Sequence, residues 1–376
     1  MSSFETMQKH YQEHDLAVKE WKDKGGKVVG YWCTNTPEEI IYAGGMLPVR
    51  LVGDPSMEIT VGNLYMEDSY CSFVRVLFDQ ILRGKFNQLD AIVIPRSCDA
   101  IIRAAKYLWT VKDMEDIQFP DMYWLEMPGS GDLISYEFYL DRVNNFKKEM
   151  EELSGNTISD DSLFKAIEVY NKNRTLLQKI VALRKSEPPR ISGTEALQII
   201  GSGFFMPKEE HNRLLEQLLE EIDTFPPKKT IRLFLSGSCM DKIETVEFIE
   251  SCGANIVGDD ICTGDRYTEG LVEPLPNPVE ALANRYLHKA PCPRMIPMER
   301  RLEDFRQKVK DSKPQGVIFY LLRWCDTNMW DYVALKDILQ ELGIPHYYLD
   351  MQEYRVTNPE SLRTRVEALI ESIGGV

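Results

Sequence analysis

Short apolar runs alternate with amphipathic stretches in the first third of the chain. The apolar runs predict strands over residues 27–32, 47–52, 90–94 and 122–125. The stretches with helical spacing predict helices over residues 3–24, 36–45, 71–82 and 99–109. Strands that alternate with helices are typical of a mostly parallel sheet covered on both faces.

The same alternation returns in the last third of the chain. Strands are predicted over residues 231–235, 254–258, 316–321 and 346–349, and helices over residues 240–251, 277–288, 298–311, 329–342 and 360–373. Residues 132–222 have helical periodicity throughout, and Pro226–Lys229 is typical of a linker. We therefore predict an α/β protein with two Rossmann-like (flavodoxin-like) lobes, residues 1–130 and 229–376, joined by a helical segment over 131–228.

One arrangement occurs in both predicted lobes, namely a buried strand that is followed by Cys-Asp and then by a helix. Cys98 follows the strand near residue 94, and Cys325 follows the strand near residue 321. Ligands of open α/β sheets bind beyond the carboxyl ends of the strands, so we expect these two cysteines to share a site. Cys71 stands at another predicted helix start. We expect the aspartates to cap the helices, and the helix N-termini to lower the thiol pKa values.

Composition and charge argue against several classes of function. The chain has 376 residues and a net charge of −15, which argues against a nucleic-acid-binding surface. No apolar run approaches the roughly 20 residues of a membrane span, and the first residues do not resemble a signal peptide. We therefore expect a cytoplasmic protein. In such a protein, eight cysteines indicate metal binding or catalysis rather than disulfides.

Three thiolates at helix starts are suited to a metal centre with one open coordination position. The alternative is that most of the eight cysteines are small buried apolar residues. There is no Cys-x-x-Cys motif, so the spacing does not decide between the two.

Five segments carry a resemblance to a known family: residues 36–48, 68–71, 97–99, 257–260 and 324–326. Through them the chain resembles a small subunit of the 2-hydroxyacyl-CoA dehydratase and benzoyl-CoA reductase family over nearly its whole length. The resemblance implies an oxygen-sensitive [4Fe–4S] cluster held by Cys71, Cys98 and Cys325. It also implies an acyl-CoA substrate, a homologous second catalytic subunit, and a separate ATP-hydrolysing iron–sulfur activator. The sequence has no Gly-x-x-x-x-Gly-Lys-Ser/Thr loop, which agrees with ATP hydrolysis by a partner.

Within this family, residues 58–71, 186–188 and 209–212 resemble small subunits of benzoyl-CoA reductase. We therefore predict a low-potential cluster that reduces the aromatic ring of benzoyl-CoA or an analogue. The segment 259–262 resembles the partner-type subunit instead. It leaves open an (R)-2-hydroxyacyl-CoA dehydratase, which eliminates water through a ketyl radical.

Two further interpretations concern the cluster. Cys33 matches a cysteine of relatives that carry a double-cubane [8Fe–9S] cluster, but the other extra cysteine expected in residues 61–65 is absent. A non-catalytic electron-relay subunit is the second interpretation. We interpret Cys239, Cys252 and Cys292 as structural and assign Cys262 no ligand role.

The sequence identifies no catalytic acid or base. Arg294, Arg300 and Arg301 are candidates for contacts with the phosphates of CoA, but a solvated helix face is the interpretation that we favour for them. We interpret Lys308, Lys310 and Lys313 as surface charge.

Overall fold

The computed structural model describes residues 2–115, 117–228 and 231–374, and within them two four-stranded sheets are entirely parallel. The first sheet has the order β2-β1-β3-β4, with β1 (Val28–Tyr31), β2 (Leu47–Arg50), β3 (Ala91–Pro95) and β4 (Asp121–Leu125). The second has the order β6-β5-β7-β8, with β5 (Arg232–Gly237), β6 (Asn255–Asp260), β7 (Gly316–Leu322) and β8 (His346–Met351). The two sheets therefore share one topology, and the predicted α/β class with two Rossmann-like lobes is confirmed.

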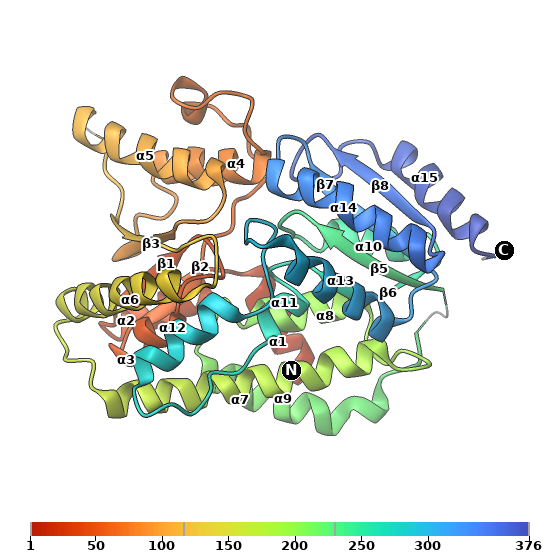
Figure 1. Ribbon diagram of the computed structural model, residues 1–376. Helices are drawn as coiled ribbons and strands as arrows, with labels where there is room; N and C mark the ends of the chain where they lie inside the picture. Colours follow the sequence, from red (N-terminus) through yellow and green to blue (C-terminus); the bar gives the residue numbers. More distant parts are fainter. Residues whose placement is uncertain (1, 116, 229–230, 375–376) are drawn as a thin grey trace.

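Helices cover both sheets and fill the segment between them (Figure 1). The first lobe contains α2 (Leu16–Asp23), α3 (Glu38–Ala43), α4 (Ser72–Leu82) and α5 (Asp99–Met114). The middle of the chain forms α6 (Leu133–Ser154), α7 (Asp160–Lys185), α8 (Gly193–Ser202) and α9 (Lys208–Glu221). The last part forms α10 (Glu244–Ser251), α11 (Asp265–Thr268), α12 (Pro278–His288), α13 (Met298–Ser312), α14 (Asp326–Leu342) and α15 (Pro359–Ser372). None of the described helices is long and apolar enough to cross a membrane.

The N-terminal helix predicted over residues 3–24 is divided in two. The first half, α1 (Ser3–Gln12), packs against α8 and α9, whereas α2 packs against β1 and β2. A single straight helix cannot reach both sets of partners, and the break at Glu13 turns the chain between them. Of the linker predicted at residues 226–229, Lys229 lies outside the described residues.

The middle helices connect the two lobes. The long helix α7 runs along the lower side of the view in Figure 1 and contacts both α3 of the first lobe and β6 of the second. From the second half of the chain, α12 returns to pack against α6. Elements far apart in the sequence therefore hold the two sheets together.

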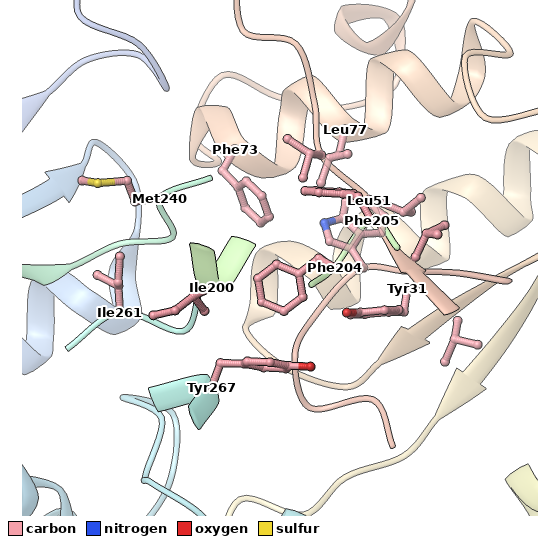
Figure 2. Close-up of a cluster of buried hydrophobic side chains, with 14 of the residues drawn as sticks. Tyr31, Leu51, Phe73, Leu77, Ile200, Phe204, Phe205, Met240, Ile261 and Tyr267 are labelled. Atoms are coloured by element: carbon pink, nitrogen blue, oxygen red, sulfur yellow. The ribbon is translucent and has the colours of Figure 1, made fainter. Parts of the chain in front are cut away.

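A shared apolar core fixes the junction between the lobes (Figure 2). Its buried side chains come from the first lobe, the middle helices and the second lobe: Tyr31, Leu51, Phe73, Leu77, Ile200, Phe204, Phe205, Met240, Ile261 and Tyr267. Close-packed interiors resist relative displacement of the elements that build them. The carboxyl ends of the two sheets consequently have a defined position relative to each other.

A buried ion pair lies at the same junction. Arg50, at the end of β2, pairs with Asp241, which follows β5. The hydroxyl groups of Tyr11 and Tyr354 donate to the backbone carbonyl and the carboxylate of Asp241, at 2.5 and 2.6 Å respectively. Because α1, both lobes and the segment after β8 all meet at one aspartate, this network fixes the geometry near the sheet ends.

Gly237, the last residue of β5, makes a close backbone contact that excludes a side chain. Its φ is +137°, and a Cβ atom would lie 2.0 Å from the carbonyl oxygen of Tyr320 in the paired strand β7. We expect Gly237→Ala to lower the free energy of unfolding by about 2–3 kcal/mol, because backbone strain and this contact act together.

Gly253 provides the matched control, since its φ is +112° and nothing lies within 4 Å of its hypothetical Cβ. We expect Gly253→Ala to cost only about 1 kcal/mol in urea-induced unfolding. Equal losses in the two variants would show that the contact with Tyr320 is unimportant.

Candidate functional site

A pocket lies where the carboxyl ends of the two sheets meet. In each sheet the chain reverses its direction across the sheet after the second strand, β2 or β6, so the switch point lies between β1 and β3 in the first sheet and between β5 and β7 in the second. Such switch points are where open α/β sheets bind ligands. Seven of the eight cysteines line this one pocket: Cys33, Cys71, Cys98, Cys239, Cys262, Cys292 and Cys325. The cavity measures about 110 Å³, well above the roughly 10–15 Å³ that one water molecule needs.

Three of these cysteines occupy equivalent positions at helix starts. Cys71, Cys98 and Cys325 are the N-cap residues of α4, α5 and α14, and in none of the three does the side chain cap the helix. In α5 and α14 the sequence analysis placed the cap one residue too late. Asp99 and Asp326 are instead the first residues of their helices, where a negative charge is also favourable.

The backbone before Cys325 adopts a conformation that is rare for a residue with a side chain. Trp324 has a φ of +65°, in the left-handed region. Such conformations are costly and are found preferentially at functional sites. The turn at Trp324 connects the end of β7 to the N-cap of α14 and brings Cys325 to the pocket.

The three thiols differ in acidity. Burial raises the pKa of Cys98 to about 12, and a hydrogen bond with Cys325 together with burial raises the pKa of Cys71 well above its ordinary value. The pKa of Cys325 falls to about 6, first through the hydrogen bond with Cys71 and further through Ser238 and Asn328. The amide nitrogen of Asn328 lies 3.3 Å from the Cys325 sulfur. The lowering of the thiol pKa that we expected for all three therefore occurs at Cys325 only, and there hydrogen bonds cause it, whereas the pKa values of Cys71 and Cys98 are raised.

The remaining four pocket cysteines also come from both lobes. Cys33 lies two residues after β1 and Cys239 two residues after β5, which are matching positions in the two sheets. Cys262 follows β6, and Cys292 follows α12. The sequence suggested a structural role for Cys239 and Cys292, and the structure brings them into the same pocket as the three N-cap cysteines. Their position after parallel strands is a signal that could have identified Cys33 and Cys239.

Basic side chains surround these four cysteines. Arg50 Nη2 lies 3.1 Å from the Cys239 sulfur. The pKa of Cys262 is lowered to about 6 by a hydrogen bond with Cys239, with additional contributions from Arg50 and Arg266. Lys289 also lines the pocket, and its ammonium group donates to the carbonyl of Thr34 at 2.7 Å. Burial lowers the pKa of Lys289 to about 7.

Cys252 lies outside the pocket. It ends α10, and its thiol donates to the carbonyl of Phe248 at 3.4 Å. Substitution of Cys252 therefore removes a thiol without changing the wall of the pocket.

The thiols of the pocket do not form a compact site for a single metal ion. Within the described ranges, no group of three or more His, Cys, Asp or Glu side chains could hold such an ion. The pocket is instead a wider space with thiols on several sides and apolar residues such as Trp32, Phe73 and Leu322 in its wall. Thiol donors in an apolar setting fit a polynuclear iron–sulfur group, which is wider than a single ion.

Of the three arginines that were candidates for contacts with the phosphates of CoA, only Arg294 lines the pocket. Arg294 lines the pocket, and its guanidinium donates to the carbonyl of Pro128 at 3.1 Å. Arg301 is buried between Asp260 and Asp331, so its proposed contact with CoA is wrong. Arg300 donates to the carbonyls of His288 and Lys289 at the end of α12. Arg294 and Lys289 are thus the cations at which a substrate in the pocket could be held.

Comparisons with known proteins agree with the resemblance. The family model for the 2-hydroxyglutaryl-CoA dehydratase D-component matches residues 33–373. The beta subunit of (R)-phenyllactyl-CoA dehydratase from Clostridium sporogenes is 27% identical over 359 residues, which are 95% of this chain and 94% of the relative. A subunit of benzoyl-CoA reductase from Thauera aromatica is 27% identical, with 89% of each protein covered. The beta subunit of (R)-2-hydroxyglutaryl-CoA dehydratase from Acidaminococcus fermentans is 25% identical, with 98% of each covered.

Proposed function

This chain belongs to the 2-hydroxyglutaryl-CoA dehydratase D-component family, and from that premise we propose that it is the iron–sulfur subunit of an acyl-CoA enzyme. Its [4Fe–4S] cluster is held by Cys71, Cys98 and Cys325. The observation that carries this proposal is the meeting of three helix N-cap cysteines, two from the first lobe and one from the second, at one pocket.

The protein around these thiols favours a negatively charged metal–sulfur group. Each of α4, α5 and α14 directs the positive end of its dipole toward the N-cap where its cysteine stands. Asn328 donates to the Cys325 sulfur, and hydrogen bonds of this kind influence the reduction potential of a cluster. Binding displaces the protons of Cys71 and Cys98, whose thiols are neutral at physiological pH. When bound, the cluster would supply single electrons at low potential.

We place the substrate in the same pocket. The apolar wall that includes Trp32 and Phe73 suits an aromatic acyl group, and Arg294 and Lys289 can hold its polar end. The names of two relatives include phenyllactyl-CoA and benzoyl-CoA, both with aromatic acyl groups. Reduction of the aromatic ring of benzoyl-CoA or an analogue is the reaction that the segments 58–71, 186–188 and 209–212 favour.

Elimination of water from an (R)-2-hydroxyacyl-CoA is the second candidate reaction. The similarity to two dehydratase beta subunits, at identities comparable with that to the reductase relative, supports it. Both reactions begin with transfer of an electron to the CoA thioester, and the thioester carbonyl delocalises the resulting radical anion. The same pocket is therefore compatible with either.

We also propose two partners. The relatives are named as subunits of enzymes, two of them as beta subunits, which supports a homologous second catalytic subunit. The sequence lacks a P-loop, which supports a separate ATP-hydrolysing iron–sulfur activator.

The test is anaerobic purification with the native partners, followed by iron and sulfide analysis and EPR of the reduced protein with benzoyl-CoA or (R)-phenyllactyl-CoA. We expect at least about four irons per chain and a signal that changes with benzoyl-CoA. A change with (R)-phenyllactyl-CoA alone would identify a dehydratase. A signal that responds to neither would indicate an electron relay, and protein without iron would refute the proposal.

A further inference from the structure

The wall of the pocket contains few groups that can release a proton near neutral pH. Among the described residues that line it there is no aspartate, glutamate, histidine or tyrosine. Apart from the thiols, its ionisable side chains are Arg50, Arg266, Arg294 and Lys289. A guanidinium group stays protonated in proteins. Lys289 is therefore the one side chain without sulfur in the described wall that can act as an acid.

The ammonium group of Lys289 is held at the pocket with part of its hydrogen-bonding capacity unused. Lys289 is the C-cap residue of α12 and is partly buried. Its Nζ donates to the carbonyl of Thr34 at 2.7 Å and lies 5.3 Å from the centre of the Tyr286 ring. An ammonium group has three N–H donors, and among the described residues only the carbonyl of Thr34 accepts one of them. The other two are available to a molecule bound in the pocket.

The charged groups around Lys289 make its neutral form accessible. No carboxylate of a described residue lies within ion-pair distance of its ammonium group. Arg285 on α12 and Arg174 on α7 oppose its positive charge, whereas the thiols of Cys33 and Cys292 favour it. Burial has the largest effect and lowers the pKa of Lys289 to about 7. An acid catalyst is most effective when its pKa lies near the working pH.

We propose that the ammonium group of Lys289 is the proton donor to the acyl-CoA in this pocket. The inference rests on the proposed function and identifies the acid that the sequence did not. In ring reduction, the thioester carbonyl gains one electron from the iron–sulfur activator, an N–H bond of Lys289 breaks, and an O–H bond forms at the carbonyl oxygen. In elimination of water, the same proton forms an O–H bond with the departing hydroxyl group while its C–O bond breaks. In both cases Lys289 is left as a neutral amine, which regains a proton from solvent.

The first test is steady-state kinetics of the holoenzyme with its native partners. Lys289→Arg keeps the positive charge but does not release a proton, so we expect kcat to fall at least about 100-fold while KM changes less than about threefold. Lys289→Gln keeps a donor for the Thr34 carbonyl without the charge, and its kcat falls to the same extent. Lys310→Arg, on the exposed side of α13, is the control and keeps wild-type kinetics.

The pH profile gives a signature that a purely structural lysine would not produce. In the wild type, kcat/KM decreases as the pH rises above about 7, the pKa of Lys289, because the ammonium form is lost. This decrease is absent from Lys289→Arg.

A second measurement does not depend on turnover. Acetic anhydride reacts with neutral amines, so mass spectrometry of the full-length wild-type chain without substrate follows acetylation of Lys289 against pH. We expect the rate to reach half of its plateau near pH 7, the pKa of Lys289, with Lys310 in the same sample as the internal reference.

Different outcomes separate this inference from the proposed function. Unchanged kcat in Lys289→Arg, or a decrease above pH 7 that persists in it, would overturn the role of Lys289 alone. A raised KM with unchanged kcat would do the same, because Lys289 would then only bind the substrate. Wild-type holoenzyme that converts neither acyl-CoA would refute the proposed function and this inference with it. If a variant loses its iron or its cooperative urea unfolding, the wild-type pH profile and acetylation decide.

Discussion

Replacing Cys98 with serine is expected to remove the iron bound by the N-cap cysteines and to reduce activity at least about 100-fold, while both lobes stay folded. The serine hydroxyl is a harder donor than a thiolate and stays protonated at neutral pH, so it is a poor ligand for an iron–sulfur cluster. Loss of a direct ligand should exceed the roughly 10–100-fold loss typical of residues that only orient ligands.

Because Cys98 is the N-cap of α5, we expect its replacement by serine to remove a ligand of the cluster without destabilising the helix. Its φ of −81° and ψ of 162° are extended, as an N-cap requires, but its side chain makes no capping hydrogen bond. Serine is among the best N-cap residues and can accept the backbone N–H that cysteine leaves uncapped. We therefore expect the metal-free Cys98→Ser protein to be as stable as the metal-free wild type, or about 0.5–1 kcal/mol more stable.

Three measurements test this expectation: iron content, turnover with acyl-CoA and reductant, and urea unfolding of the metal-free proteins. Cys252→Ser is the matched control, because it removes a sulfur outside the pocket. Wild-type iron content in Cys98→Ser would refute the ligand assignment. A large drop in the stability of the metal-free variant would show that Cys98 has a structural role instead.

Local sequence signals predicted much of the fold and one part of the site. Six of the described strands are buried at every residue, as is typical of parallel sheets covered on both faces, whereas β4 and β8 are partly exposed. Cys98 and Cys325 were predictable because each directly joins such a strand to a helix. The topology alone then brings them to one edge of each sheet.

The other thiols of the pocket were not predicted to join Cys98 and Cys325, although Cys33 and Cys239 each follow a parallel strand. Cys239 and Cys262 approach Cys33 only because the two lobes pack through a common core, which no local pattern describes. The sequence analysis considered two additional cysteines, namely Cys33 and one within residues 61–65, and the second is absent. Besides Cys33, the pocket receives the thiols of Cys239, Cys262 and Cys292 from the second lobe, more than a hundred residues after Cys71.

The interpretation of Lys308, on α13, as surface charge is wrong. Surface charge was the expectation for Lys308, yet this residue is buried and pairs with Asp260 and Asp304. The signal that could have corrected this is in β6, where Asp259 and Asp260 end a strand whose every residue is buried. Buried carboxylates require cationic partners, and α13 packs against β6.

Asp260 is the centre of this buried network. Arg301 contacts both Asp260 and Asp331, and all three side chains are almost completely buried. Burial alone would raise the pKa of Asp260, but Arg301, Arg266 and Lys308 outweigh it and hold the pKa below the usual range. At Asp331 burial outweighs Arg301, and the pKa is raised. Protonation of Asp260, which three cations contact, therefore determines how the network loses stability at acid pH.

The lowered pKa of Asp260 determines the direction in which the free energy of unfolding changes with pH. The carboxylate stabilises the folded state at pH values above about 4, its pKa in the unfolded chain, and this contribution is lost as the pH falls toward the folded-state pKa. Arg301→Met should raise that folded-state pKa, so the variant should lose stability at a higher pH than the wild type during acid titration.

At neutral pH, Arg301→Met is expected to lower the free energy of unfolding by about 3–5 kcal/mol, because it leaves Asp260 and Asp331 buried with too little positive charge. Arg306→Met is the control on the same helix. Arg306 pairs with the exposed Glu341 at 2.7 Å, and loss of such a surface pair costs about 0–1 kcal/mol. Urea unfolding of the two variants measures the difference. Equal losses would mean that Arg266 and Lys308 compensate Asp260 by themselves, and that Arg301 is not needed to hold β6 against α13 beside the pocket.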